Sequence, residues 1–127
     1  MSNKDKKFST LPTADKALFF VERLTDKKAG SIVAFDLSKE NSMSEAVVIA
    51  NATSIRHAQG LADHLLQAAK DEHFEFLNME GHSVGRWILL DFNDVIVHIF
   101  QPDSRDLFRL DDLWNRAPLL ADTRVYL

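Results

Sequence analysis

The strongest constraint on the fold lies in segment 86–100, where two apolar runs flank the short polar break Asn93-Asp94. The runs are rich in β-branched and aromatic residues, and a two-residue break between such runs is typical of a β-hairpin. With those two residues as the loop, pairing continues outward and places Leu89 opposite His98. The register of this hairpin therefore decides which side chains share a face.

Alternation of side chains along each strand divides the hairpin into an apolar face and a mixed face. The apolar face carries Ile88, Leu90, Phe92, Val95, Val97 and Ile99. The mixed face carries Trp87, Leu89, Asp91, Ile96, His98 and Phe100. We expect the apolar face to belong to the core. The mixed face combines a large apolar surface with an acid and an imidazole, so the protein either covers it or offers it to a partner.

The composition indicates one globular domain, because 127 residues with 46% hydrophobic and 27% charged side chains suffice for a core. The net charge of −4 argues against a general nucleic-acid binder, which would need a basic stripe, but suits a basic protein partner. The absence of cysteine excludes thiolate metal sites and a cysteine nucleophile. No apolar run approaches the roughly 20 residues of a membrane span and the N-terminus is polar, so we expect a prokaryotic cytoplasmic protein without a membrane partner.

Hydrophobic periodicity along the rest of the chain predicts the α/β class, with a mixed sheet of about five strands flanked by helices. Helices are expected over residues 13–28, over residues 54–70 and from Pro102 toward Pro118. Thr13 would be the N-cap of the first helix, and Thr53 or Ser54 that of the second. The last helix would carry an apolar stripe of Leu107, Leu110 and Trp114. Strands are expected over residues 31–37, 46–50 and 74–78 and in the hairpin. The domain would span residues 13–118, between flexible tails at 1–12 and 119–127.

An enzyme is the main alternative to an interaction protein. Asp91, Asp94 and His98, with Asp63 and His64 on the preceding helix, offer groups that could hold a divalent metal or transfer protons. A metal-dependent phosphohydrolase or a nucleotidyltransferase-like enzyme would use such groups. Their spacing argues against it, because His98 lies opposite an apolar residue, with Asp91 only as its diagonal neighbour. Asp94 lies in a turn that favours aspartate for its geometry.

Other catalytic motifs carry less weight. The stretch Gly81–Gly85 reads as a literal Gly-x-Ser-x-Gly, but a nucleophile elbow needs a strand before it and a helix after it, whereas here a strand follows. No glycine-rich phosphate loop of the Walker or dinucleotide type occurs. We therefore expect no catalysis and no cofactor.

Several short motifs together resemble the ribosomal silencing factor, or Iojap-like, family. In order they are Asn51-Ala-Thr-Ser-Ile-Arg56, Ala62-Asp63-His64, Glu80-Gly81, Trp87-Ile-Leu-Leu-Asp91, Asp94-Val-Ile-Val-His98 and the stretch from Leu110 to Trp114. The resemblance covers residues 12–118 and implies a fold like a nucleotidyltransferase core without its catalytic acids. It also implies binding to universal large-subunit ribosomal protein fourteen on the large ribosomal subunit, which blocks joining of the small subunit and lowers translation when nutrients are short.

A steric mechanism of this kind needs occupancy and no chemistry, so the expected site is a protein contact surface. We expect Trp87 and Leu89 to be apolar anchors and Glu80, Asp91 and Asp94 to face a basic partner, with Gly81 and His98 beside them. A homodimer that uses the mixed face on itself stays open, because strand parity does not show which of these residues the helices cover. Direct sequence-specific binding of nucleic acid is not expected.

Overall fold

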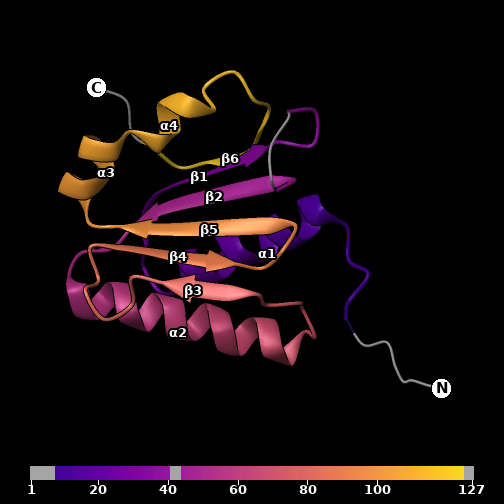
Figure 1. Cartoon of the computed structure of the whole chain (residues 1–127), viewed down its shortest axis with the longest axis horizontal. Helices are drawn as coiled ribbons and strands as arrows, with labels where there is room; N and C mark the ends of the chain where they lie inside the picture. The colour runs from indigo at the N-terminus through magenta and orange to yellow at the C-terminus, as the bar shows by residue number, and fades with distance from the viewer. Residues whose placement is uncertain (1–7, 41–43, 125–127) are drawn as a thin grey trace.

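The computed structural model describes residues 8–40 and 44–124, which form a six-stranded sheet in the order β3-β4-β5-β2-β1-β6 (Figure 1). The strands are β1 (Gly30–Asp36), β2 (Ala46–Asn51), β3 (Asn78–Glu80), β4 (Trp87–Asp91), β5 (Val95–Phe100) and β6 (Leu119–Asp122). The helices are α1 (Thr13–Asp26), α2 (Ile55–Asp71), α3 (Pro102–Phe108) and α4 (Leu110–Leu113). β2 and β5 run parallel and the other neighbours antiparallel, which confirms a mixed α/β fold with one strand more than expected.

The predicted hairpin register is confirmed. Leu89 pairs with His98 and Asp91 with Ile96, and the Phe92 amide donates to the Val95 carbonyl at 2.9 Å. The six residues of the predicted apolar face, Ile88, Leu90, Phe92, Val95, Val97 and Ile99, are all fully buried. They belong to the larger core cluster, which α1 and α2 close with residues such as Phe20, Leu24, Leu61 and Leu65.

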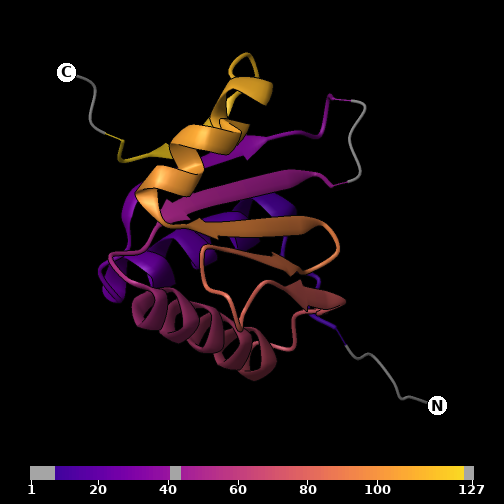
Figure 2. The ribbon, with the colours of Figure 1, turned by 60° about the vertical axis from the view of Figure 1, so that its left-hand side comes forward.

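The opposite face of the sheet is covered over only part of its width. A second core cluster contains Phe35, Val47, Ile49 and Phe100, on which Leu110 and Trp114 of the α3–α4 region pack. Figure 2 shows α3 and α4 as a cover beside the β1–β2 end of the sheet, well separated from α2. Trp87 also packs against this cluster, and the other outward side chains of β3 and β4 lie beyond the cover.

The two long helices begin close to the predicted positions. Ser54 is the N-cap of α2, and its hydroxyl oxygen accepts a hydrogen bond from the His57 amide at 3.0 Å. The expected cap at Thr13 is wrong, because Pro12 precedes the helix and Thr13 is its first residue. The Thr13 hydroxyl instead donates to Asp94 at 2.8 Å and so ties α1 to the hairpin turn. None of the described helices is both long and apolar enough to cross a bilayer.

The strand expected to begin at Phe74 is shifted toward the C-terminus. The Phe74 amide donates to the Ala69 carbonyl at 2.8 Å, and its ring packs edge-on against Phe20, so this residue closes the end of α2. Contact with β4 begins only where the Leu77 amide donates to the Asp91 carbonyl at 2.8 Å. The apolar character of Phe74 thus reflects core packing at a helix end.

The prediction of a single C-terminal helix is also wrong. Arg109 adopts a left-handed conformation with φ of 55°, which separates α3 from α4 and changes the direction of the chain. Leu107 and Leu113 are consequently exposed, whereas Leu110 and Trp114 pack on the sheet. The expected apolar stripe is therefore divided between two surfaces.

The described parts of both segments predicted as tails make contacts with the domain. Residues 119–122 form β6, which pairs antiparallel with β1, so the prediction of a tail from residue 119 is wrong for this part. The four-residue strand lacks an alternating pattern of its own and is stabilised by the backbone of β1. Residues 125–127 and 1–7 lie outside the described residues. In the described part of the N-terminal segment, the Ser9 amide donates to the His73 carbonyl at 2.8 Å.

Candidate protein-interaction surface

The uncovered part of the outer sheet surface is formed by one side of β3, β4 and β5. Because paired residues project to the same side of a sheet, the register places Glu80 beside Leu89, and Asp91 beside Ile96. We call this set the open face: Glu80, Trp87, Leu89, Asp91 and Ile96. Each of the five remains at least partly accessible to solvent. The structure thus brings together four of the seven residues proposed from the sequence, Glu80, Trp87, Leu89 and Asp91.

Trp87 lies where the open face meets α3, and three neighbours hold its ring. Its indole Nε1–H donates to Nδ1 of His98 at 3.0 Å. The ring stacks on Phe100 with centroids 4.9 Å apart and packs against Phe108 at 4.7 Å. A partly exposed tryptophan fixed in this way loses little conformational entropy on binding.

His98 supports Trp87 from below the surface. The imidazole is 6% exposed, and burial lowers the pKa of His98 to about 4. An indole N–H can only donate, so Nδ1 of His98 is the acceptor and the neutral ring carries its proton on Nε2. His98 is therefore adjacent to the open face without being a surface residue.

Two surface pockets share Trp87 as a wall. The first, of about 310 Å³, is lined by Glu80, Gly81, Trp87 and Leu89. The second, of about 430 Å³, is lined by Val84, Arg86, Trp87, Asp103, Ser104, Leu107 and Phe108. Leu107, which is 75% exposed, and Phe108, which is 50% exposed, line the second pocket together with exposed Val84, so exposed apolar side chains gather at one place.

The loop between β3 and β4 forms one rim of these pockets and is held by α2. His82 Nε2 lies 3.0 Å from Asp63 Oδ1, and the side-chain Nε2 of Gln59 donates to the His82 carbonyl oxygen at 2.9 Å. Gly81 has φ of +84°, and a Cβ there would collide with the Trp87 carbonyl oxygen. Gly81 therefore supports the pocket rim through its backbone conformation. The literal Gly-x-Ser-x-Gly stretch is a loop between two strands.

Asp94 lies in the hairpin turn, and α1 occupies its carboxylate. Lys16 Nζ, on a residue that is itself buried, donates to Oδ1 at 2.7 Å, and the Thr13 hydroxyl donates to Oδ2 at 2.8 Å. These contacts give Asp94 a role in fixing α1 to the turn. Its proposed contact with a partner has no support from this geometry.

The residues of the enzyme alternative are not assembled into a metal site. Within residues 8–40 and 44–124, no group of three or more His, Asp or Glu side chains is placed to hold a metal ion. Asp63 pairs with His82, while burial and the charges of Lys27 and Arg23 lower the pKa of His64. The Trp87 indole donates to His98, and Lys16 and Thr13 donate to Asp94, so these groups make structural contacts.

Residues of the α3 side were not among the predicted site residues. The sequence places Leu107 in an apolar helical stripe and does not single out Val84 or Phe108 as contact residues. Their exposure depends on the left-handed conformation of Arg109 and on the path of loop 81–85, neither of which has a periodic signal. The useful signal in the sequence is the alternation of side chains along the hairpin strands, which places Trp87 on the outer side of the sheet.

Comparison with known proteins identifies the family. A family model described as "Ribosomal silencing factor during starvation" matches residues 10–125. The chain belongs to the ribosomal silencing factor family. A ribosomal silencing factor from Haemophilus influenzae is 35% identical over 96 residues, which cover 76% of this chain and 94% of the relative.

More distant relatives and solved structures agree with this assignment. A crystal structure of a Chromobacterium violaceum protein superposes with a TM-score of 0.75 at 31% identity, covering 80% of this chain and 83% of that one. A mouse protein named "Mitochondrial assembly of ribosomal large subunit protein 1" is 25% identical over 100 residues, covering 75% of this chain and 43% of the relative. The match to the crystal structure confirms the mixed α/β architecture.

The buried, neutral state of His98 predicts a loss of stability in acid. Between pH 6.5, the ordinary pKa of histidine, and the native pKa of about 4, the unfolded chain binds a proton at His98 that the folded protein does not. The free energy of unfolding should therefore fall by up to about 3 kcal/mol from this group as the pH drops through that interval. Urea denaturation of wild type and His98→Gln at several pH values measures this contribution. Equal pH slopes for the two proteins would contradict it.

Gly81 predicts a large backbone effect at the rim of the open face. Gly81→Ala should lower the free energy of unfolding by at least about 2 kcal/mol, because it combines a positive φ with a collision against Trp87. Gly60→Ala is the matched control, since Gly60 lies within α2 with nothing within 4 Å of a new Cβ. That control should gain about 0.5–1 kcal/mol. Thermal and urea unfolding test both values. An unchanged free energy of unfolding in Gly81→Ala would refute this backbone role of Gly81.

Proposed function

We propose that the protein binds large-subunit ribosomal protein fourteen through the open face and thereby blocks joining of the small ribosomal subunit. Repression of translation under nutrient limitation would follow from this occupancy. Membership of the ribosomal silencing factor family supports the role. The observation that carries the choice of surface is the rigidly held, partly exposed Trp87 between two pockets.

The chemistry of the open face suits a basic protein partner. Trp87 and Leu89 offer apolar contacts, while Glu80 and Asp91 place carboxylates around them. Apolar anchors ringed by charge are typical of protein interfaces, and the net charge of −4 would speed the approach of a basic partner. In this proposal His98 and Gly81 act by supporting the surface, and Asp94 stabilises the turn beneath it.

The large subunit is the expected location of the partner. The name of the mouse relative associates that protein with assembly of the mitochondrial large ribosomal subunit. A factor seated on a protein at the subunit interface occupies volume that the small subunit requires. Such a mechanism needs stable occupancy and no reaction, in keeping with a surface of shallow pockets and contact side chains.

Self-association is the competing use of the same surface. Val84, Leu107 and Phe108 expose apolar area next to Trp87, and a second copy of the chain could cover it. The two uses predict a different dependence of the molecular mass of the free protein on its concentration. Sedimentation equilibrium of the free protein, with and without Trp87→Ala, would detect a dimer formed through this surface.

Trp87→Ala tests the proposed docking surface. Loss of this anchor should weaken binding to purified large subunits by about 2 kcal/mol or more, which is roughly a thirtyfold rise in Kd, and should relieve inhibition of subunit joining. Leu18→Ala is the control, because Leu18 is an exposed apolar residue on α1, away from the open face. Co-sedimentation and a subunit-joining assay provide the measurements. Wild-type affinity of Trp87→Ala, or binding to small subunits alone, would refute the proposal.

Glu80→Lys tests the electrostatic part of the proposal. Reversing this charge at the rim should slow association with large subunits by about threefold or more at low salt, with the difference shrinking at high salt. Glu72→Lys, at the exposed C-terminal end of α2, makes the same charge change elsewhere. Stopped-flow association at two ionic strengths compares the variants. Equal slowing by both would assign the effect to net charge and not to the open face.

A further inference from the structure

The helix α3 forms one wall of the interaction surface although its buried side chains are polar. Its buried residues are Ser104 and Arg105, whereas Leu107 and Phe108 are exposed toward the pocket beside Trp87. A helix of seven residues is too short to be stable by itself in water. Besides the packing of Phe108 on Trp87, a polar contact must therefore fix α3 against the sheet.

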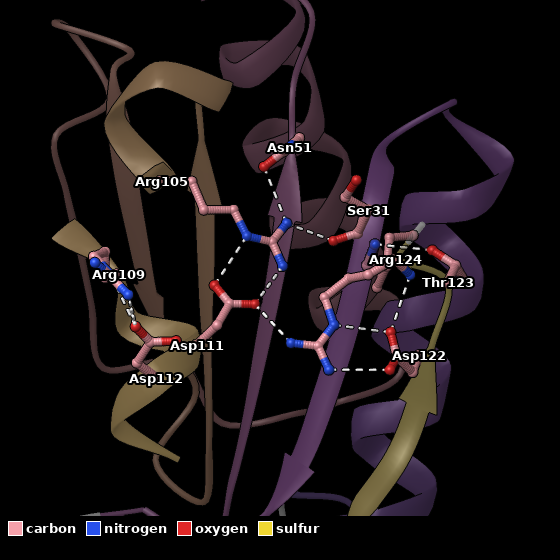
Figure 3. Close-up of polar contacts among 10 residues, drawn as sticks. Ser31, Asn51, Arg105, Arg109, Asp111, Asp112, Asp122, Thr123 and Arg124 are labelled. Atoms are coloured by element: carbon pink, nitrogen blue, oxygen red, sulfur yellow. Dashed lines mark hydrogen bonds and ion pairs between the residues drawn. The ribbon is translucent and has the colours of Figure 1, made fainter. Parts of the chain in front are cut away.

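Arg105 supplies that attachment (Figure 3). Its Nε and Nη2 donate to the two carboxylate oxygens of Asp111 at 3.0 and 2.8 Å. Its Nη1 donates to Asn51 Oδ1 at 3.0 Å and to the Ser31 carbonyl oxygen. One guanidinium thus joins α3 to α4 and to the adjacent ends of β1 and β2.

The attachment continues to the edge of the sheet through Asp111. Arg124 Nη1 donates to Asp111 Oδ2 at 3.0 Å, and Arg124 also donates to both carboxylate oxygens of Asp122 in β6. Burial raises the pKa of the Asp111 carboxyl, but the hydrogen bonds and charges of Arg105 and Arg124 outweigh it, so the pKa lies below its usual range. The carboxylate therefore stays ionised between two arginines.

We propose that Arg105 is a positioning residue for partner binding, which holds Leu107 and Phe108 beside Trp87 without touching the partner. This inference rests on the proposed function of the open face and extends it to a residue on the far side of α3. Arg105 is 7% exposed, so a bound partner has little access to it. Without the guanidinium of Arg105, α3 loses its connection to Asn51 and Ser31. Partner binding must then include the entropy cost of ordering α3.

The experiment compares two arginines of the same segment. Arg105→Met keeps an unbranched apolar stem but removes the guanidinium. Arg116→Met is the matched control, because Arg116 lies in the same segment, after the end of α4, and is exposed. Arg105→Lys retains the charge without the planar fork and serves as the milder variant if Arg105→Met folds poorly.

Two measurements are made on each variant. Amide hydrogen exchange over residues 102–114 and the indole N–H resonance of Trp87 report the position of α3 in the free protein. Co-sedimentation reports affinity for purified large subunits. We expect fast exchange, a shifted Trp87 resonance and at least about tenfold weaker binding for Arg105→Met, an intermediate loss for Arg105→Lys, and no change for Arg116→Met.

The outcomes separate this inference from the proposed function. Unchanged exchange and an unchanged Trp87 resonance in both Arg105 variants would overturn the positioning role, whatever the ribosome data show. Wild-type affinity for large subunits in an Arg105 variant whose α3 exchanges fast would also overturn the positioning role. In that case, weaker binding of Trp87→Ala to large subunits would still support docking through the open face. If wild-type protein fails to bind large subunits, the proposed function fails, and with it the use of α3 in binding.

Discussion

The register of the β4–β5 hairpin is the constraint on which the other features depend. Pairing of Leu89 with His98 turns the apolar face of the hairpin toward α1 and α2 and leaves the mixed face on the outer side. A slip by one residue would exchange these faces. The turn secures the register, because Asn93 takes φ of 78° and Asp94 is bonded to Lys16 in α1.

The outer face shows how one surface serves both stability and binding. Over β1 and β2 it is closed by residues near α4, and over β3 and β4 it is open to solvent. Trp87 lies at the border, with its ring against Phe100 on the covered side and next to two pockets on the open side. The buried guanidinium of Arg105 holds α3 at this border. Its hydrogen bonds restrict the orientation of α3 more strictly than aliphatic contacts would.

Elements with strong periodicity could be predicted from the sequence, and elements defined by their neighbours could not. The hairpin and α2 have clear patterns and a cap at Ser54, and β2 is an unbroken apolar run between two partners. β3 and β6 are short, and each exists through the backbone of the adjacent strand. The break at Arg109 requires a positive φ that its residue type does not favour, so only the folded structure shows it.

The sequence by itself determined the α/β class, the family resemblance and the residues that share the outer side of the hairpin, because these depend on local period and motif. Tertiary structure decided which of those residues a partner can reach. His98 and Trp87 have the same parity, yet His98 is buried and Trp87 is partly exposed. That difference arises from side chains distant in the sequence, since Trp114 lies beside the His98 ring, with centroids 6.4 Å apart, whereas Trp87 lines two surface pockets.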